Sequence, residues 1–148
     1  MRLLVGVGNR DRGDDAAGRE VARRLLVGGP PGFDVRECKG EATALMEAWA
    51  GYDDVVLVDA CRAGGAPGTV HRIGPEDTAG MATLRHASTH SLGVAAAIGL
   101  ARALGTVPRR LVVYAIEAGH AREGAGLSPE VERAVEEVVA AIRRDVAL

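Results

Sequence analysis

Short runs of apolar residues alternate along this chain with longer segments in which apolar and polar residues are mixed. Runs of four or five residues bounded by glycine, proline or charged residues are typical of buried strands. The pattern predicts strands at Leu3–Val7, Phe33–Arg36, Val55–Val58, Thr69–Ile73 and Leu111–Ile116. The run at Thr69–Ile73, with Val70 and Ile73 as its apolar residues, is expected to be an antiparallel strand at the edge of the sheet.

The mixed segments predict helices, because their apolar residues recur three or four positions apart. The expected helices are Asp14–Val27, Ala42–Ala50, His90–Leu104 and Pro129–Val146, with Ser128 placed to cap the last one. Gly74–His86 has no clear period and is expected to be irregular. Strands that alternate with helices indicate an α/β fold, a three-layer α/β/α domain around a mostly parallel five-stranded sheet with one antiparallel edge strand. We expect this single domain to span residues 1–148.

Composition narrows the class of protein. The chain has 148 residues, is 47% hydrophobic and carries a net charge of −2, which suits one soluble domain and disfavours nucleic acid as a partner. No apolar run is long enough for a membrane span or a signal peptide, so we expect a cytoplasmic protein. The two cysteines, Cys38 and Cys61, have no metal-type spacing and are expected to be reduced, small apolar side chains.

Ligands of open α/β sheets bind at the carboxyl ends of the strands, where the helices that follow also begin. Several residues of chemical interest are predicted at this edge: Gly6, Gly8, Asn9, Asp14, Asp15, Glu41, Asp59, His90 and Glu117. Carboxylates together with an imidazole suit zinc, nickel, manganese or iron. The positions are too scattered to form a local motif, so spacing alone is a weak signal.

Each of these residues also has a purely structural interpretation. Asp14 is a natural N-cap of the first helix, which leaves Asp15 open to either role. His90 could simply hydrogen-bond at a helix start. Asp59 follows the apolar run Val55–Val58, where an ionised carboxylate is costly unless it is paired or bound to a cation.

Common nucleotide and hydrolase motifs are missing from the sequence. The glycine loop that starts at Gly6 has Asp11 where a dinucleotide-binding loop has its third glycine. There is also no phosphate-binding loop with its lysine and no nucleophile elbow around a serine.

Several separated motifs, in order along the chain, resemble those of the hydrogenase maturation endopeptidases. They are Gly6–Asn9, Gly13–Gly18, Val58–Ala60, Ala66–Thr69, Thr89–Gly93 and Gly126–Val131. The resemblance covers nearly the whole chain. It implies an endopeptidase that removes a C-terminal peptide from the precursor of a nickel-iron hydrogenase large subunit after nickel has been inserted.

The resemblance also implies roles for individual residues. Asp15, Asp59 and His90 would bind the nickel carried by the precursor and would form the catalytic group, with either a carboxylate or the substrate's nickel activating water. Which group is the general base stays open. No resident organic cofactor is expected, the partner is the large-subunit precursor, and we expect a monomer.

Substrate contacts are expected from the glycine loop and from one further carboxylate. The backbone at Gly6 and Gly8 and the amide of Asn9 would hold the peptide or stabilise the oxyanion. Many members of the family carry a Gly-Gly-Thr-like segment where this chain has Cys38–Thr43, so Glu41 adds a carboxylate there. Many members also have Glu in place of Asp15.

Alternatives to an endopeptidase remain at this point. A peptidyl-tRNA hydrolase opens with a similar strand end, but it needs a basic surface and a histidine soon after the asparagine, whereas the first histidine here is His71. A non-enzymatic module that binds a metal or the precursor is a second alternative. A nickel chaperone would show a histidine-rich tract, which four scattered histidines do not form. No role is assigned to His86 or His120.

Overall fold

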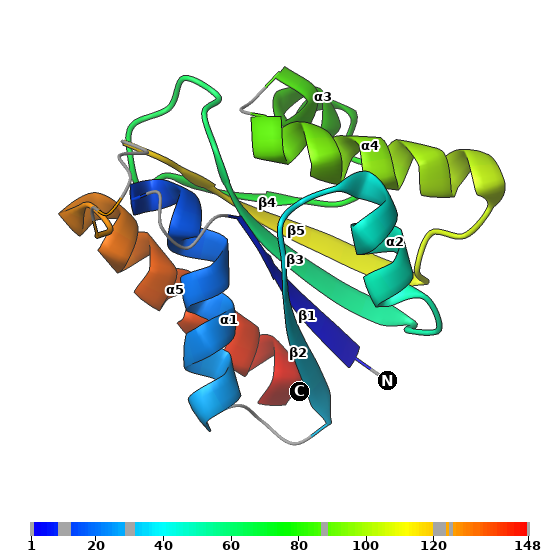
Figure 1. The fold of residues 1–148 in the computed structure, drawn as a ribbon, viewed down its shortest axis with the longest axis horizontal. Helices are drawn as coiled ribbons and strands as arrows, with labels where there is room; N and C mark the ends of the chain where they lie inside the picture. Colours follow the sequence, from blue (N-terminus) through cyan, green and yellow to red (C-terminus); the bar gives the residue numbers. More distant parts are fainter. Residues whose placement is uncertain are drawn as a thin grey trace.

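A five-stranded sheet forms the centre of the molecule, with the strand order β2-β1-β3-β5-β4. The structure is a computed structural model and describes residues 2–8, 13–28, 32–86, 89–119, 124 and 126–147. The strands are β1 (Arg2–Val7), β2 (Phe33–Cys38), β3 (Asp54–Cys61), β4 (Val70–Ile73) and β5 (Arg110–Glu117). β1, β2, β3 and β5 are parallel, whereas β4 is antiparallel to β5 at the edge, as predicted (Figure 1).

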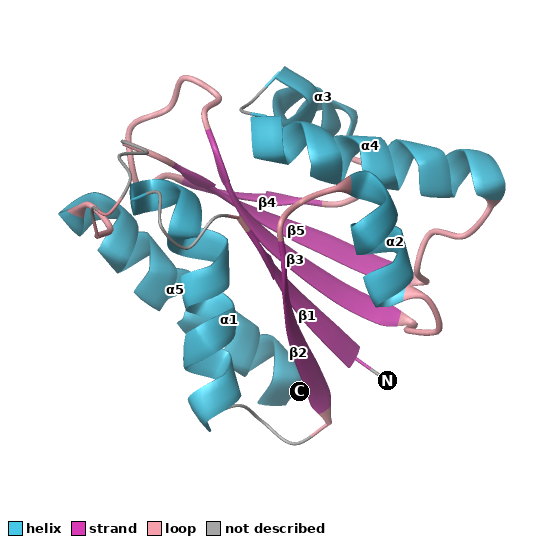
Figure 2. Cartoon of the chain, viewed as in Figure 1, coloured by secondary structure: helices cyan, strands magenta, loops and turns pink. Residues whose placement is uncertain are grey.

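Helices cover both faces of this sheet. α1 (Ala17–Gly28) and α5 (Pro129–Ala147) lie on one face, and α2 (Ala42–Trp49), α3 (Thr78–His86) and α4 (Thr89–Leu104) lie on the other (Figure 2). A short 3-10 turn, η1 (Gly13–Ala16), leads into α1. The expected three-layer α/β/α architecture is therefore confirmed. Within the described residues, every helix is too short or too polar to cross a membrane.

Alternation along β3 decides which layer each of its side chains meets. Leu57 and Cys61 belong to the core under α2, α3 and α4, whereas Val58 belongs to the core under α1 and α5. Asp59 has the same parity as Leu57 and Cys61, so it faces the layer that contains α4. By the same rule Glu117 of β5 shares this face with Val113 and Ala115.

Several boundaries differ from the sequence-based expectation, and the ends of β3 and β5 matter for the site. β3 and β5 each extend beyond their apolar runs, because Asp59 pairs with Ala115 and Cys61 pairs with Glu117 in the parallel ladder. Asp59 and Glu117 therefore lie within strands, not after them. The prediction stopped both strands before their acidic residues, because a hydrophobic pattern cannot reveal a charged residue that is held inside a sheet.

The segment expected to be irregular contains a helix, α3, and that prediction was wrong. Asp77 begins the helix by accepting a hydrogen bond from the backbone N–H of Gly80 at 2.9 Å. Met81 and Leu84, three residues apart, are both buried against the sheet. These two signals were present in the sequence but were too short to stand out as a period.

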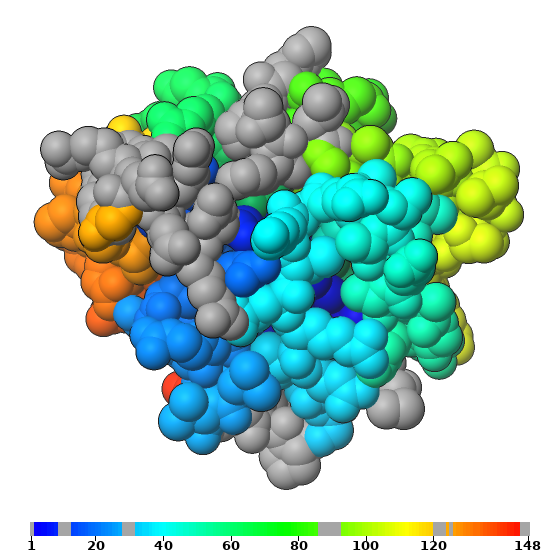
Figure 3. Space-filling view, viewed as in Figure 1, coloured from blue at the N-terminus to red at the C-terminus, as the bar shows by residue number. Residues whose placement is uncertain are grey.

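The start of α1 lies unusually close to the ends of β1 and β3. A Cβ atom added to Gly18 would lie 2.2 Å from the carbonyl oxygen of Val58, and one added to Gly6 would lie 2.4 Å from the carbonyl oxygen of Gly18. Only glycine allows this backbone contact. Little of β1, in dark blue, is left visible between α1 and the cyan β2 and α2 (Figure 3). The contact fixes η1 beside the carboxyl edge of the sheet.

Candidate active site

Asp59 is the most unusual residue at the carboxyl edge of the sheet. Its exposed fraction is 0%, and its Oδ1 accepts a hydrogen bond of 2.8 Å from the backbone N–H of Ala60. Its Oδ2 is buried with no hydrogen-bond partner. Buried polar atoms are almost always paired, so an unpaired carboxylate oxygen indicates a ligand or a role in chemistry.

The charge state of Asp59 reflects this environment. Burial raises the pKa of Asp59 well above its usual range, and the nearby negative charge of Asp15 raises it further, while the Ala60 hydrogen bond lowers it. A carboxyl whose pKa is raised in a pocket beside another acid is a frequent property of catalytic and metal-binding residues. The structure thus brings Asp15 and Asp59 together, although 44 positions separate them in the chain.

Asp15 lies in η1 with an exposed fraction of 7%. The turn holds it there because Gly8, at the end of β1, lies directly against its backbone: a Cβ on Gly8 would be 2.1 Å from the Asp15 carbonyl oxygen. Gly8 also has a positive φ of 140°, which favours glycine. The structure therefore gives Gly6 and Gly8 packing reasons to be glycine, and their expected contacts with substrate stay a prediction.

Asp14 does not occupy the capping position expected from the sequence, because it lies inside η1 and the α-helix starts at Ala17. Its carboxylate, with an exposed fraction of 0%, accepts hydrogen bonds from Gly119 N at 2.7 Å, Ser128 N at 2.7 Å and Ser128 Oγ at 2.9 Å. Asp14 thus joins the start of α1 to both ends of the loop between β5 and α5. Asp14 is therefore the anchor of the site, whereas only one of the two carboxylate oxygens of Asp59 is hydrogen-bonded.

His90 lies in the first turn of α4, and its backbone is described but its side chain is not. Gly93, one turn further on, contacts the loop before α2, since a Cβ there would be 1.6 Å from the Gly40 carbonyl oxygen. This contact brings the segment of Glu41 next to the start of α4. Glu41 is exposed at the N-cap position of α2 and accepts a hydrogen bond of 2.9 Å from Thr43. Asn9 and His120 lie outside the described residues.

A second cluster at this edge was missed by the sequence reasoning. Cys61, His71 and Glu117 each offer one ligand atom, and these atoms lie within 4.8 Å of one another. Glu117 was predicted at its strand end, but nothing joined it to the other two residues. The antiparallel edge strand was predicted without its neighbour or register, and its pairing with β5 brings His71 to the same face as Glu117.

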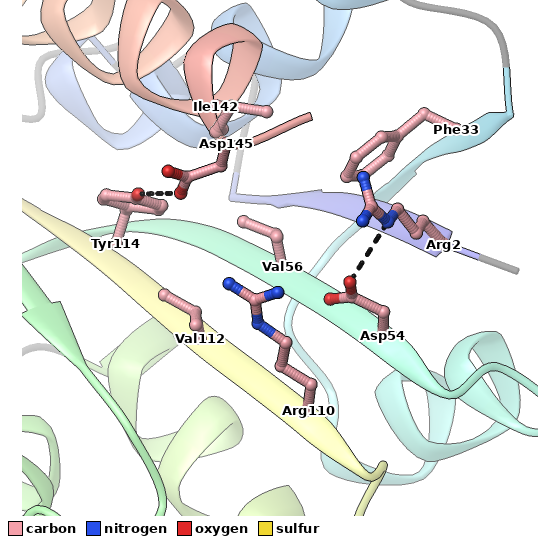
Figure 4. Close-up of a pocket in the computed structure, with 9 residues that line it drawn as sticks. All are labelled: Arg2, Phe33, Asp54, Val56, Arg110, Val112, Tyr114, Ile142 and Asp145. Atoms are coloured by element: carbon pink, nitrogen blue, oxygen red, sulfur yellow. Dashed lines mark hydrogen bonds and ion pairs between the residues drawn. The ribbon is translucent and has the colours of Figure 1, made fainter. Parts of the chain in front are cut away.

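A small pocket lies at the other end of the sheet, where the parallel strands begin (Figure 4). Arg2, Asp54 and Arg110 stand there at the amino ends of their strands, beside Tyr114 and Asp145. Arg2 forms an ion pair of 3.2 Å with Asp54, and both side chains are partly exposed. None of the predicted site residues lines this pocket.

Fold and site together define an α/β protein with an acidic centre at the carboxyl edge of its sheet. The hydrogenase maturation protease family model matches residues 40–145, most of the chain. The chain belongs to this family, and its function is that of an endopeptidase. No curated protein matches the sequence.

Solved structures of the same family have this fold. The hydrogenase maturating endopeptidase HybD from E. coli is 26% identical with a TM-score of 0.75, and the match covers 98% of this chain and 93% of that one. The [NiFe] hydrogenase maturation protease HybD from Thermococcus kodakarensis is 26% identical with a TM-score of 0.79, covering 97% of both chains. The corresponding HycI protease from Thermococcus kodakarensis is 25% identical with a TM-score of 0.70, covering 96% and 89%.

Proposed function

We propose that this endopeptidase removes a C-terminal peptide from the nickel-loaded precursor of a nickel-iron hydrogenase large subunit, and that Asp15, Asp59 and His90 bind the precursor's nickel. The observation that carries the proposal is Asp59 Oδ2, a buried carboxylate oxygen without a hydrogen-bond partner beside a second acid. A divalent cation would supply the partner that this oxygen lacks and would relieve the repulsion between the two acids.

The donor set suits nickel. The imidazole is a borderline ligand that suits nickel or zinc, and carboxylate oxygens are harder ligands that also bind these ions. Asp15 is held by η1, Asp59 by β3 and His90 by the first turn of α4, so three rigid elements would position the ion. Because the ion arrives with the precursor, binding it would place the scissile bond at the carboxyl edge of the sheet.

Cleavage then needs a water molecule activated near the bound ion. The nickel itself or one of the two carboxylates would take this role, and the tetrahedral oxyanion would be stabilised by donors from the glycine loop at Gly6, Gly8 and Asn9. Glu41, exposed beside the start of α4, would contact the peptide that is removed. In this proposal the enzyme works as a cytoplasmic monomer.

The test is incubation of the purified protein with nickel-loaded and nickel-free large-subunit precursor, with loss of the C-terminal peptide followed by mass spectrometry. We expect cleavage of the nickel-loaded form only. Asp59→Asn and His90→Ala should each slow cleavage by at least about 100-fold.

A matched control lies on the same strand. Asp54→Asn changes an acid at the opposite end of β3, in a partly exposed ion pair with Arg2, and should leave the rate within about twofold. Cleavage of nickel-free precursor, or normal cleavage by both site variants, would contradict the proposal. A stable complex of nickel-loaded precursor with the wild-type protein and no cleavage would favour a binding module.

A further inference from the structure

Three potential metal ligands from three strands meet beside the candidate active site. Cys61 is the last residue of β3, Glu117 is the last residue of β5, and the two are partners in the parallel ladder. His71 of β4 faces them from the sheet edge, with its Nε2 3.0 Å from Glu117 Oε1. The described structure has no other group of three or more such ligand atoms this close together.

Glu117 is buried without a full positive partner. Its exposed fraction is 1%. Its carboxylate is hydrogen-bonded to His71, to the side chain of Cys61 and to the backbone N–H of Ala63, which donates to its Oε2 at 3.1 Å. The loop after β3 closes over it, since a Cβ on Gly65 would lie 3.1 Å from Glu117 Oε1. A carboxylate enclosed in this way is costly to keep unless a cation or strong donors bind it.

We propose that Cys61, His71 and Glu117 form a second metal site, which binds a divalent transition-metal ion of the zinc type. Thiolate, imidazole and carboxylate are the three ligand types that zinc prefers. Three protein ligands with one position left for water or another small ligand are typical of sites that are not purely structural. The proposal does not depend on the nickel-binding role of Asp15, Asp59 and His90.

The positions of the ligand atoms suit this ion. Two nitrogen or oxygen ligands of a tetrahedral zinc lie about 3.4 Å apart, and a sulfur and a nitrogen ligand about 3.6 Å apart. The separation of 3.0 Å between His71 Nε2 and Glu117 Oε1 needs a change of only a few tenths of an ångström. The upper limit of 4.8 Å for the whole set leaves the remaining adjustment to side-chain rotation.

The two proposed sites are neighbours on one strand. Asp59 and Cys61 are two residues apart on the same face of β3, which corresponds to about 6–7 Å along a strand. A metal ion at the second site would therefore lie close to the Asp15–Asp59 pair and would add positive charge there. The open ligand position lies on the side of His71, the partly exposed member, whose side chain is 32% exposed.

Cobalt(II) provides a direct test because a cobalt–thiolate bond gives a charge-transfer absorption band in the near ultraviolet. Metal-free protein is titrated with cobalt(II), and we expect this band to saturate at one equivalent. Zinc should then displace the cobalt and remove the band. Glu117→Gln and His71→Ala should each weaken cobalt binding by at least about tenfold.

The chain offers a matched control, because Cys38 is its only other cysteine. Cys61→Ser should abolish the band, whereas Cys38→Ser and Asp59→Asn should keep it. Absence of the band in the wild-type protein, its persistence in Cys61→Ser, or its loss in Cys38→Ser would overturn the proposal. Loss of the band in Asp59→Asn would also overturn it, by showing that the thiolate-bound ion needs Asp59 and that Cys61, His71 and Glu117 do not form a separate site. If Cys61→Ser does not fold, unchanged cobalt affinity in His71→Ala, a change at a partly exposed side chain, overturns it.

Discussion

Charged residues at the amino ends of the strands differ in burial and pairing from those at the carboxyl ends. At the amino ends of the strands, Arg2 and Asp54 form a partly exposed ion pair, and Tyr114 donates a hydrogen bond of 3.4 Å to Asp145 (Figure 4). At the carboxyl ends, the buried charged residues of the described structure are all acids, namely Asp14, Asp15, Asp59 and Glu117. The amino ends of the strands therefore carry paired charges that are partly exposed to water, whereas the carboxyl ends carry buried acidic residues.

The comparison distinguishes the partly exposed charges of the Arg2–Asp54 ion pair from buried acids that need compensation by hydrogen bonds or cations. A surface ion pair contributes little and costs little. Buried acids raise the free energy of the folded protein unless hydrogen bonds or cations compensate them. Among the four acids, Asp14 is compensated by hydrogen bonds from Gly119 and Ser128, whereas Asp59 keeps one oxygen without a hydrogen-bond partner. The same end of the sheet thus contains one acid held by several hydrogen bonds and one acid with an unpaired oxygen.

The largest expected effect on stability comes from removing the anchor. Asp14→Ala leaves the backbone N–H groups of Gly119 and Ser128 without their acceptor and should lower the free energy of unfolding by about 3 kcal/mol. Urea denaturation measures this loss. Ser128→Ala removes only the hydroxyl contact with Asp14 and should cost about 1 kcal/mol. Equal losses in the two variants would show that Asp14 is not the anchor.

A smaller effect of opposite sign is expected at Asp59. Because the pKa of Asp59 is raised in the folded protein, the folded state binds this proton more tightly than the unfolded chain does. Its contribution to stability is therefore full below the ordinary pKa of 3.8 and is lost as the pH rises through the folded pKa. Asp59→Asn should remove this loss and make the metal-free protein about 1–2 kcal/mol more stable at pH 7 than the wild type.

The measurement for Asp59 is urea denaturation of wild type and variant at several pH values from 4 to 8, without added metal. The gain from Asp59→Asn should grow with pH and disappear at the acidic end. A constant difference between the two proteins across this range would contradict the assignment of the effect to the ionisation of Asp59.

The smallest effect is expected at the amino edge. Arg2→Ala breaks a partly exposed ion pair and should cost about 0.5 kcal/mol, with the difference shrinking as salt is added. Thermal unfolding at low and high salt measures it. A loss as large as that of Asp14→Ala would remove the contrast between the two edges.

Most of the fold was predictable because its signals are local. The apolar runs of the strands and the periods of α1, α2, α4 and α5 all follow from a few neighbouring residues. The prediction failed for α3, whose buried positions Met81 and Leu84 are too few to establish a period. It also ended β3 too soon, since Asp59 is held in the strand by a ladder partner, Ala115, from far along the chain.

The location of the site was predictable from the sequence, but the different contacts made by its individual acidic residues were not. Strand-end geometry gathered Asp14, Asp15 and Asp59 at one edge, and the structure places Asp15 close enough to act on Asp59. The sequence predicted a helix cap at Asp14 and left Asp15 open to a functional role, but it contained no sign of the bonds that hold Asp14. Only the distant loop that contains Gly119 and Ser128 makes the first an anchor. The cluster of Cys61, His71 and Glu117 depends in the same way on the pairing of three strands.

The hydrogen bonds from Ser128 to Asp14 also determine when, during synthesis of the chain, Asp14 can first be held in place. The two residues are 114 positions apart, and a ribosome adds roughly 5–20 residues each second. About 6–23 s therefore separate the synthesis of the two partners. During that time the acids in the first half of the chain lack the loop residues that hold Asp14 in place. A nascent chain therefore contains Asp14, Asp15 and Asp59 well before it contains Ser128.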